Sequence, residues 1–303
     1  MYQELLSELR AMEDGPEVLT DEPMGSHTSF RIGGNADVFI TPRSTDQTAR
    51  VLSAVKRTGL PYFILGNGSN LLVSDSGYRG IVIRLYKNIS DVKVEGDTVT
   101  AEAGASLSAI AAAARNASLT GFEFAAGIPG TLGGAVVMNA GAYGGEMKDV
   151  VEAAEVLTPD GRLISIPGKD LGFGYRKSII RSSDYVVLSA RLRLKKGDRE
   201  EITALMKDLQ QRRISKQPLE FPSAGSTFKR PEGYFAGKLI EDAGLRGFSV
   251  GGAMVSDKHC GFVINRGSAS ASDVYSLICQ VKDRVKAQSG VDLEPEVLFL
   301  GDF

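Results

Sequence analysis

The sequence predicts an α+β protein with two lobes, the first of which is built from two subdomains. Short helices and strands alternate up to about residue 85, and from Val92 the hydrophobic residues alternate with the period of two typical of paired strands. The composition shifts at residues 195–198, and the region that follows ends in a long amphipathic helix. We therefore expect domains over residues 1–197, with subdomains of about 1–85 and 86–197, and over residues 198–303.

The first subdomain is predicted from short periodic segments. Residues 2–12 are expected to form a helix because Leu5, Leu6 and Leu9 share one face. Ser44, followed by Asp46 and Gln47, starts a predicted helix over residues 44–56. The predicted strands cover residues 38–40, 62–65 and 81–85.

The second subdomain is predicted to contain two hairpins. Alternating residues on both sides of Gly96 and Asp97 indicate the first, and residues 155–166, with Asp160 and Gly161 at the turn, indicate the second. An alanine-rich helix is expected over residues 106–118 and a further strand over residues 185–194.

The last lobe begins after a predicted helix over residues 199–214. A second helix is expected over residues 272–289, because its apolar residues form one stripe. A final strand is expected over residues 294–300, where Pro295 restricts it to a sheet edge or a strand start. The stripe consists of Val274, Leu277, Ile278, Val281 and Val285.

The overall composition excludes several classes of protein. The 303 residues are 43% hydrophobic and 24% charged, with a formal net charge of −2, so there is no basic excess for nucleic-acid binding. Cys260 and Cys279 are the two cysteines, which gives no disulfide framework and fits a reducing compartment. The acidic, amphipathic start is not a secretory signal, and no apolar run has membrane length. We expect a cytoplasmic protein without nucleic-acid or membrane partners.

Two glycine-rich segments carry the strongest indication of a bound cofactor. Residues 125–145 hold no charge and seven glycines, and residues 64–73 have the same character directly after a predicted strand. Glycine loses the most backbone freedom on folding, so such segments are typical of places where backbone must approach a ligand closely. Two of them predict a cofactor held mainly by main-chain N–H groups, as phosphates often are. Ordinary tight turns are the alternative.

The common nucleotide and metal motifs are missing. Gly66 and Gly68 are followed by Leu71 where a G-x-G-x-x-G motif needs its third glycine, and the sequence contains no P-loop motif. His27 and His259 are the two histidines, and neither has a second ligand at helical spacing. We expect no metal site, and a device other than a Rossmann turn or P-loop for any nucleotide.

Three further segments could carry chemistry. Tyr175 and Arg176 follow two glycines, and an arginine fork binds a carboxylate through two parallel hydrogen bonds. Gly225 allows a turn from which Ser226 can project as a proton donor. Glu294 and Glu296 share one face of the last predicted strand, and either carboxylate, if buried beside Arg176, could position that arginine or move a proton. The alternatives are a solvated arginine, a loop hydroxyl and a solvated carboxylate.

These motifs, taken in order, resemble those of the UDP-N-acetylenolpyruvoylglucosamine reductase family over nearly the whole chain, from about His27 to the C-terminus. Each motif alone is modest, but five in this order are specific. The matching segments are ILGNGSNLLV at 64–73, AGIPGTLGGA at 126–135 with NAGAY at 139–143, YRKS at 175–178, GSTFK at 225–229 and LEPEV at 293–297.

The resemblance implies a flavin-binding domain of the vanillyl-alcohol-oxidase (PCMH) type with non-covalent FAD, followed by a C-terminal α+β substrate-binding domain. It implies NADPH as hydride donor, and UDP-N-acetylenolpyruvoylglucosamine as the substrate that enters the same cleft afterwards. Arg176 and Glu296 would stabilise the enolate-like intermediate, and Ser226 would protonate the carbon next to the carboxylate. The implied cofactor-binding residues are Gly66, Asn67, Gly68, Ser69, Asn70, Gly127, Ile128, Pro129, Gly130, Thr131, Gly133, Gly134 and Asn139.

One departure from the family pattern concerns the cover of the substrate. Some members have an extra loop with a tyrosine that closes over the sugar nucleotide, whereas residues 190–226 leave room only for a strand end, one helix and a short link, as in the shorter (type II) subtype. The covering residue and the oligomeric state stay open. Candidate substrate contacts are Tyr175, Lys229, Arg246, His259 and Asn265.

Two other functions remain possible from the sequence. One is a flavin oxidase of the same fold that uses oxygen. The other is a nucleotide-sugar binding or transfer protein without redox chemistry. Flavin colour and the reoxidant of the reduced flavin separate the three hypotheses.

Overall fold

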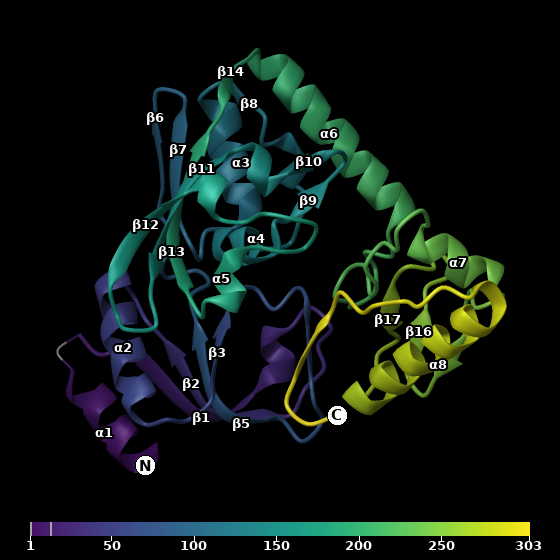
Figure 1. Cartoon of the computed structure of the whole chain (residues 1–303), viewed down its shortest axis with the longest axis horizontal. Helices are drawn as coiled ribbons and strands as arrows, with labels where there is room; N and C mark the ends of the chain where they lie inside the picture. The colour runs from purple at the N-terminus through teal and green to yellow at the C-terminus, as the bar shows by residue number, and fades with distance from the viewer. Residues whose placement is uncertain (1, 13) are drawn as a thin grey trace. The chain divides into compact units, whose positions relative to one another are not determined.

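The computed structural model describes residues 2–12 and 14–303 (Figure 1). The chain forms two compact units. Unit 1 comprises residues 1–19, 38–67 and 81–212, and unit 2 comprises residues 20–37, 68–80 and 213–303. The chain therefore passes between the units several times. The last of these passages lies within helix α6 (Arg199–Lys216), C-terminal to the predicted boundary at residues 197 and 198. The predicted functional division at that boundary stays a prediction.

The N-terminal part of unit 1 pairs short helices with strands. Ser44 is the N-cap of α2 and its side chain accepts a hydrogen bond from the Gln47 N–H, as the sequence predicts. Strand β3 runs parallel to β5, and a four-stranded sheet has the order β1-β2-β5-β3. The elements that lie wholly in this part are α1 (Tyr2–Ala11), α2 (Thr45–Arg57) and β3 (Tyr62–Leu65). The strands β1 (Glu17–Pro23), β2 (Asn35–Thr41) and β5 (Tyr78–Arg84) each include residues assigned to unit 1 and residues assigned to unit 2.

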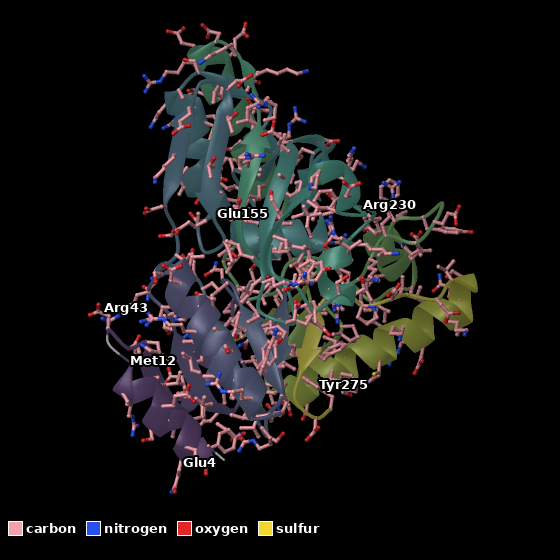
Figure 2. All side chains as sticks on the ribbon, turned by 60° about the vertical axis from the view of Figure 1, so that its left-hand side comes forward. Glu4, Met12, Arg43, Glu155, Arg230 and Tyr275 are labelled. Carbon is pink, nitrogen blue, oxygen red and sulfur yellow. The ribbon has the colours of Figure 1, made fainter. Side chains whose placement is uncertain are left out.

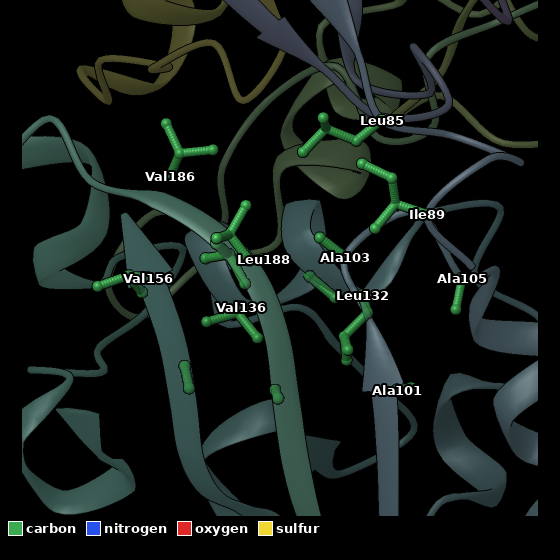
Figure 3. Packing of buried hydrophobic residues seen from close by; sticks show 14 of the residues in the cluster. Leu85, Ile89, Ala101, Ala103, Ala105, Leu132, Val136, Val156, Val186 and Leu188 are labelled. Atoms are coloured by element: carbon green, nitrogen blue, oxygen red, sulfur yellow. The ribbon is translucent and has the colours of Figure 1, made fainter. Parts of the chain in front are cut away.

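The larger part of unit 1 is built on an antiparallel five-stranded sheet of order β12-β11-β13-β7-β6. Helices α3 and α4 pack against it, and Leu132 and Val136 of α4 join Leu188 of β13 in the buried core (Figure 3). The elements are β6 (Val92–Glu95), β7 (Thr98–Glu102), α3 (Leu107–Asn116), β8 (Leu119–Thr120), η2 (Glu123–Ala125), α4 (Leu132–Met138), β9 (Gly141–Ala142), β10 (Gly145–Glu146), η3 (Met147–Asp149), β11 (Val151–Leu157), β12 (Leu163–Pro167), η4 (Gly168–Asp170), α5 (Ile179–Ser182), β13 (Val186–Arg193) and β14 (Lys195–Lys196).

Unit 2 packs helix α8 against a small antiparallel sheet of order β15-β16-β17. All five residues of the predicted apolar stripe of α8 are buried, which confirms that helix and its orientation. Strand β18 pairs in parallel with β4. The elements are η1 (Met24–His27), β4 (Leu71–Val73), α7 (Ala236–Asp242), β15 (Ser249–Val250), β16 (Ala253–Val255), β17 (Val263–Asn265), α8 (Ala271–Ser289) and β18 (Leu298–Leu300).

Two expectations about the elements need correction. The glycine-rich segment does not remain a loop throughout, because residues 132–138 form helix α4, whose first amides are held by main-chain carbonyls of the neighbouring segment. The last strand is shorter than predicted, because residues 294–297 form hydrogen bonds with residues 70 and 227–229 and regular pairing begins only at Leu298. Sequence patterns miss both features because the partners are far away along the chain.

Candidate functional site

In unit 1 the two predicted glycine-rich segments lie side by side. The Asn67 Nδ2 donates a hydrogen bond of 2.8 Å to the carbonyl oxygen of Pro129, 62 residues away along the chain. A Cβ atom on Gly66 would lie 2.5 Å from the Thr131 Oγ1, so a side chain at this position would force Thr131 to move. The end of β3 and the start of α4 therefore present bare backbone to the same region of unit 1.

Some main-chain N–H groups of these two segments donate hydrogen bonds within the chain, and others do not. The N–H groups of Leu132 and Gly133, at the start of α4, donate to the carbonyl oxygens of Ala105 and Ala103, each at 2.9 Å. Gly133 also packs closely on Ala103, since a Cβ there would lie 3.1 Å from the Ala103 Cβ. These two amides are therefore unavailable to a ligand.

Other amides of the same segments remain available. Within residues 2–12 and 14–303, the main-chain N–H groups of Gly66, Asn67, Gly127 and Gly134 donate no hydrogen bond to the chain. Gly66, Asn67 and Gly127 are half-buried, and Gly134, in the first turn of α4, is exposed. Main-chain N–H groups that are not paired within the chain can bind an anionic ligand such as a pyrophosphate. The residues present therefore fit the predicted mode of cofactor binding.

Unit 2 contains the second half of the first glycine loop. Gly68 has φ +62°, and a Cβ there would lie 2.0 Å from the carbonyl oxygen of His27, so only glycine fits. The Asn70 side chain donates to the carbonyl oxygen of Glu296 at 3.1 Å, and the Asn70 carbonyl accepts from Leu298 N–H at 3.1 Å. Asn70 thereby fixes the backbone that carries Glu296. The contacts of Gly68, Ser69 and Asn70 with a cofactor stay a prediction.

Arg176 lies at the tip of a two-residue turn in unit 1. Gly174 and Lys177 exchange two main-chain hydrogen bonds, of 3.0 and 3.1 Å, on either side of Tyr175 and Arg176. Arg176 has φ +54°, a backbone conformation that non-glycine residues adopt rarely and often at functional sites. Its guanidinium carbon lies 5.1 Å from the centroid of the exposed Tyr175 ring.

The structure brings Ser226 and Glu296 together in unit 2. The Glu296 N–H donates to the carbonyl oxygen of Thr227 at 2.8 Å, and Phe228 lies opposite Pro295 in an antiparallel bridge. Thr227 is buried, and its hydroxyl accepts from the Val263 N–H at 2.9 Å, which anchors this segment. The Ser226 side chain is exposed next to that anchor, whereas Glu296 is half-buried.

The remaining predicted substrate contacts in unit 2 have different surroundings. Lys229 forms an ion pair with Glu294, and Arg246 forms one with Glu241 at 2.6 Å. Asn265 is buried, and its Nδ2 donates one of its two hydrogens to the Phe30 carbonyl at 3.1 Å, while its Oδ1 accepts from two main-chain N–H groups. Asn265 therefore organises its own loop, and its contact with substrate stays a prediction.

His259 and Cys260 lie next to Arg246. Burial lowers the pKa of His259, and the positive charge of Arg246 acts in the same direction. The His259 Nδ1 accepts from the Gly261 N–H at 3.1 Å, and its ring packs edge-on against Phe262. Burial raises the pKa of the Cys260 thiol, which disfavours the reactive thiolate.

The His259 environment predicts a pH dependence of stability. A folded-state pKa below the usual 6.5 means that stability is fully present above pH 6.5 and is lost as the pH falls toward the lower folded value. We expect the melting temperature of the wild type to fall in this window and His259→Gln to reduce that fall. Thermal unfolding over a pH series tests this, with His27→Gln as the matched control. An unchanged pH profile in His259→Gln would contradict it.

Gly66→Ala is expected to weaken binding of FAD, the cofactor that the family resemblance implies. The added Cβ meets the Thr131 Oγ1, and overpacking of this kind costs about 1–3 kcal/mol, which corresponds to roughly tenfold to a hundredfold in affinity. Fluorescence titration of the apoprotein with FAD measures the change. Thr131→Ala removes the oxygen involved, so the double variant should recover much of the loss. If the loss of FAD-binding free energy in the double variant equals the sum of the losses in the two single variants, steric crowding between residues 66 and 131 is not the cause.

Sequence reasoning missed two features of these sites. Glu146 bonds to Asn139 and contributes charge near Arg176, but no spacing pattern in the sequence indicates it. Ser29 donates to the carbonyl of Ser223 at 2.6 Å and holds the segment that leads to Ser226. Both depend on contacts between residues that no local motif connects.

Residues 2–12 and 14–303 contain no cluster of three or more His, Cys, Asp or Glu side chains able to hold a metal ion. Over the same residues, no helix combines the length and the apolar character that crossing a bilayer requires.

Two family matches define the class of protein. Residues 36–167, which contain both glycine-rich loops, match the family described as FAD binding domain, so the protein is a flavoprotein with an FAD-binding domain. Residues 217–300, which contain Ser226 and Glu296, match the family described as UDP-N-acetylenolpyruvoylglucosamine reductase, C-terminal domain. Arg176 lies between the two matched regions.

Full-length relatives define the family. The chain is 53% identical over 286 residues to UDP-N-acetylenolpyruvoylglucosamine reductase of Clostridioides difficile, covering 94% of each chain. It is 52% identical over 302 residues to the reductase of Caldanaerobacter subterraneus, covering 100% of both. The crystal structure of the Thermus caldophilus reductase superposes with a TM-score of 0.81 at 38% identity, covering 94% of this chain and 99% of the other. The chain belongs to the UDP-N-acetylenolpyruvoylglucosamine reductase family, as the motifs predicted.

Proposed function

We propose that the protein reduces the enolpyruvyl group of UDP-N-acetylenolpyruvoylglucosamine to UDP-N-acetylmuramate, a step of peptidoglycan synthesis, with FAD as cofactor and NADPH as hydride donor. The observation that carries the proposal is the pairing of the Ser226 and Glu296 segments inside the matched C-terminal domain. A donor hydroxyl and a carboxylate on adjacent backbone are the groups that a protonation step at a carbon centre needs.

FAD would be held by the backbone of residues 66–70 and 127–134, where the available N–H groups lie. The chemistry that FAD supplies when bound is the acceptance and donation of hydride. Main-chain N–H groups suit the pyrophosphate of FAD because they bind an anion through their dipoles. They carry no net charge, so the protein without FAD has no unpaired cation at this position. The low charge of residues 125–145 agrees with this mode of binding.

The side chains act on the substrate. Arg176 binds the carboxylate of the enolpyruvyl group through its two-pronged guanidinium and stabilises the negative charge that develops there when the methylene carbon gains hydride. The Ser226 hydroxyl delivers the proton to the carbon next to the carboxylate, so that the double bond gains one hydride and one proton. Glu296 assists in stabilising the intermediate.

Five further residues are proposed to contact the substrate. Tyr175, Lys229, Arg246, His259 and Asn265 are proposed contacts of the sugar nucleotide. The cytoplasmic location and the absence of nucleic-acid and membrane partners remain predictions from the composition.

Mass spectrometry of the product tests the proposal. Purified protein with bound FAD, NADPH and UDP-N-acetylenolpyruvoylglucosamine should yield a product heavier than the substrate by two hydrogens. Repeating the reaction in deuterated water with unlabelled NADPH should place one deuterium next to the carboxylate, because Ser226 exchanges its proton with solvent. Oxidation of NADPH that consumes oxygen and leaves the sugar unchanged would favour an oxidase and contradict the proposal.

A further inference from the structure

Asn139 has no hydrogen-bonding capacity left for a cofactor on its amide nitrogen. The residue ends helix α4 with φ +43° and is 1% exposed. Its Nδ2 carries two hydrogens, and these are donated to the Glu146 Oε2 and to the carbonyl oxygen of Gly174, both at 3.0 Å. Its Oδ1 accepts from the Lys148 N–H at 2.9 Å. The side chain therefore joins three segments of unit 1.

One of these segments is the turn that carries Arg176. Gly174 is the residue on which the turn closes, and the Asn139 amide holds its carbonyl oxygen in place. On the other side of the turn, the Ser178 hydroxyl donates to the carbonyl of Val137 at 2.8 Å. The turn is thus tied at both ends to the last residues of α4. A residue at φ +54° such as Arg176 persists only where the surroundings fix it.

Glu146 supplies the charge on the other side of Asn139. Its carboxylate accepts from Asn139 and forms an ion pair of 2.7 Å with Lys148. The pKa of Glu146 lies below its usual value, because its carboxylate accepts hydrogen bonds from Lys148 and Asn139 and lies near the positive charge of Arg176. The carboxylate therefore stays ionised at neutral pH. A fixed negative charge near Arg176 restrains where the guanidinium points.

We propose that Asn139 and Glu146 are positioning residues for Arg176, and that Asn139 serves the substrate site through the Gly174 carbonyl rather than as a ligand of FAD. The inference rests on the proposed function, in which Arg176 binds the substrate carboxylate. A bidentate contact between a guanidinium and a carboxylate loses most of its stabilising free energy when the guanidinium is displaced by up to about 1 Å.

Asn139→Asp is the most informative variant. Aspartate keeps the size and the tolerance for positive φ, but it removes the donor to the Gly174 carbonyl and places a second carboxylate beside Glu146. We expect the reoxidation of reduced flavin by the enolpyruvyl sugar to slow on the order of tenfold to a hundredfold, and the dissociation constant of the sugar, measured by calorimetry, to rise. FAD affinity and flavin reduction by NADPH should stay within about twofold of wild type.

Two further variants separate the contributions. Glu146→Gln keeps an acceptor for Asn139 but removes the charge, so it should cause a smaller loss in the same half-reaction. Glu155→Gln is the matched control, because Glu155 is an exposed glutamate of the same unit on β11 (Figure 2). It should behave as wild type in every assay.

A double-mutant cycle shows whether Asn139 acts through Arg176. In the Arg176→Lys background, Asn139→Asp should add less than about twofold, because the contact it positions is already lost. Full additivity would overturn the inference. So would a loss of FAD affinity with an unchanged reoxidation rate per bound flavin, which would make Asn139 a cofactor ligand. A wild-type protein that does not reduce the sugar would instead overturn the proposed function, and the inference with it.

Discussion

Ser226→Ala is expected to leave flavin reduction by NADPH nearly unchanged and to slow the reduction of the enolpyruvyl sugar by on the order of a hundredfold or more. The physical reason is that hydride transfer to the flavin needs no proton from the Ser226 hydroxyl, whereas the carbon next to the carboxylate must receive a proton. Ser226 is exposed beside the buried Thr227, so losing its hydroxyl leaves no unpaired group in the core. Stopped-flow absorbance at the flavin bands separates the two half-reactions.

Ser223→Ala is the matched control for this variant. Ser223 lies in the same segment, and the contact that it contributes to unit 2 uses its main-chain carbonyl, which accepts from Ser29. Both half-reactions should therefore proceed at wild-type rates. Equal losses in the two half-reactions of Ser226→Ala would show that Ser226 has a structural role, and the proton donor would have to be sought elsewhere.

Arg176→Lys is expected to reduce turnover on the order of a hundredfold, although it conserves the charge. Lysine cannot form two parallel hydrogen bonds with a carboxylate, and it lacks the planar group that contacts the Tyr175 ring. The backbone at φ +54° is equally strained with either side chain, so the substitution reports on the guanidinium itself. Measurement of kcat and KM with the enolpyruvyl sugar should show the loss mainly in kcat/KM.

Arg181→Lys controls for the chemistry of the substitution. Arg181 is exposed on the short helix α5 that follows the turn, and it has no part in the proposed site. Its replacement should leave kcat and KM unchanged. Near-normal turnover of Arg176→Lys would remove Arg176 from the residues that bind the carboxylate.

Much of the fold could be predicted from local patterns. The strand at residues 62–65 has the predicted bounds, and the hairpin around Gly96 and Asp97 pairs as expected. These elements are specified by periodicity and turn residues that act over a few positions. Helix α4 could not be predicted, because glycine and β-branched residues disfavour helix and the helix depends on the carbonyls of Ala103 and Ala105.

The candidate site, like the fold, could be predicted from local patterns only in part. Motifs identify the residue types around Arg176, Ser226 and Glu296, but the pairing of the last two depends on hydrogen bonds between segments about 70 residues apart in the sequence. The family motif assigns Asn139 to the cofactor, whereas we propose that it positions the turn of Arg176, because both hydrogens of its amide nitrogen are donated within the chain. A motif indicates that a residue is required, but it does not show which atoms that residue contacts.

The central claim is that backbone of the glycine loops holds FAD and that reducing equivalents pass from it to the enolpyruvyl sugar. Anaerobic stopped-flow with NADPH, followed by the sugar in a second mixing step, tests this most directly. The account predicts that acid releases the flavin, that NADPH bleaches it, and that the sugar restores its colour faster than oxygen does. A protein that takes up no flavin on reconstitution, or a reduced flavin that only oxygen reoxidises, would contradict it.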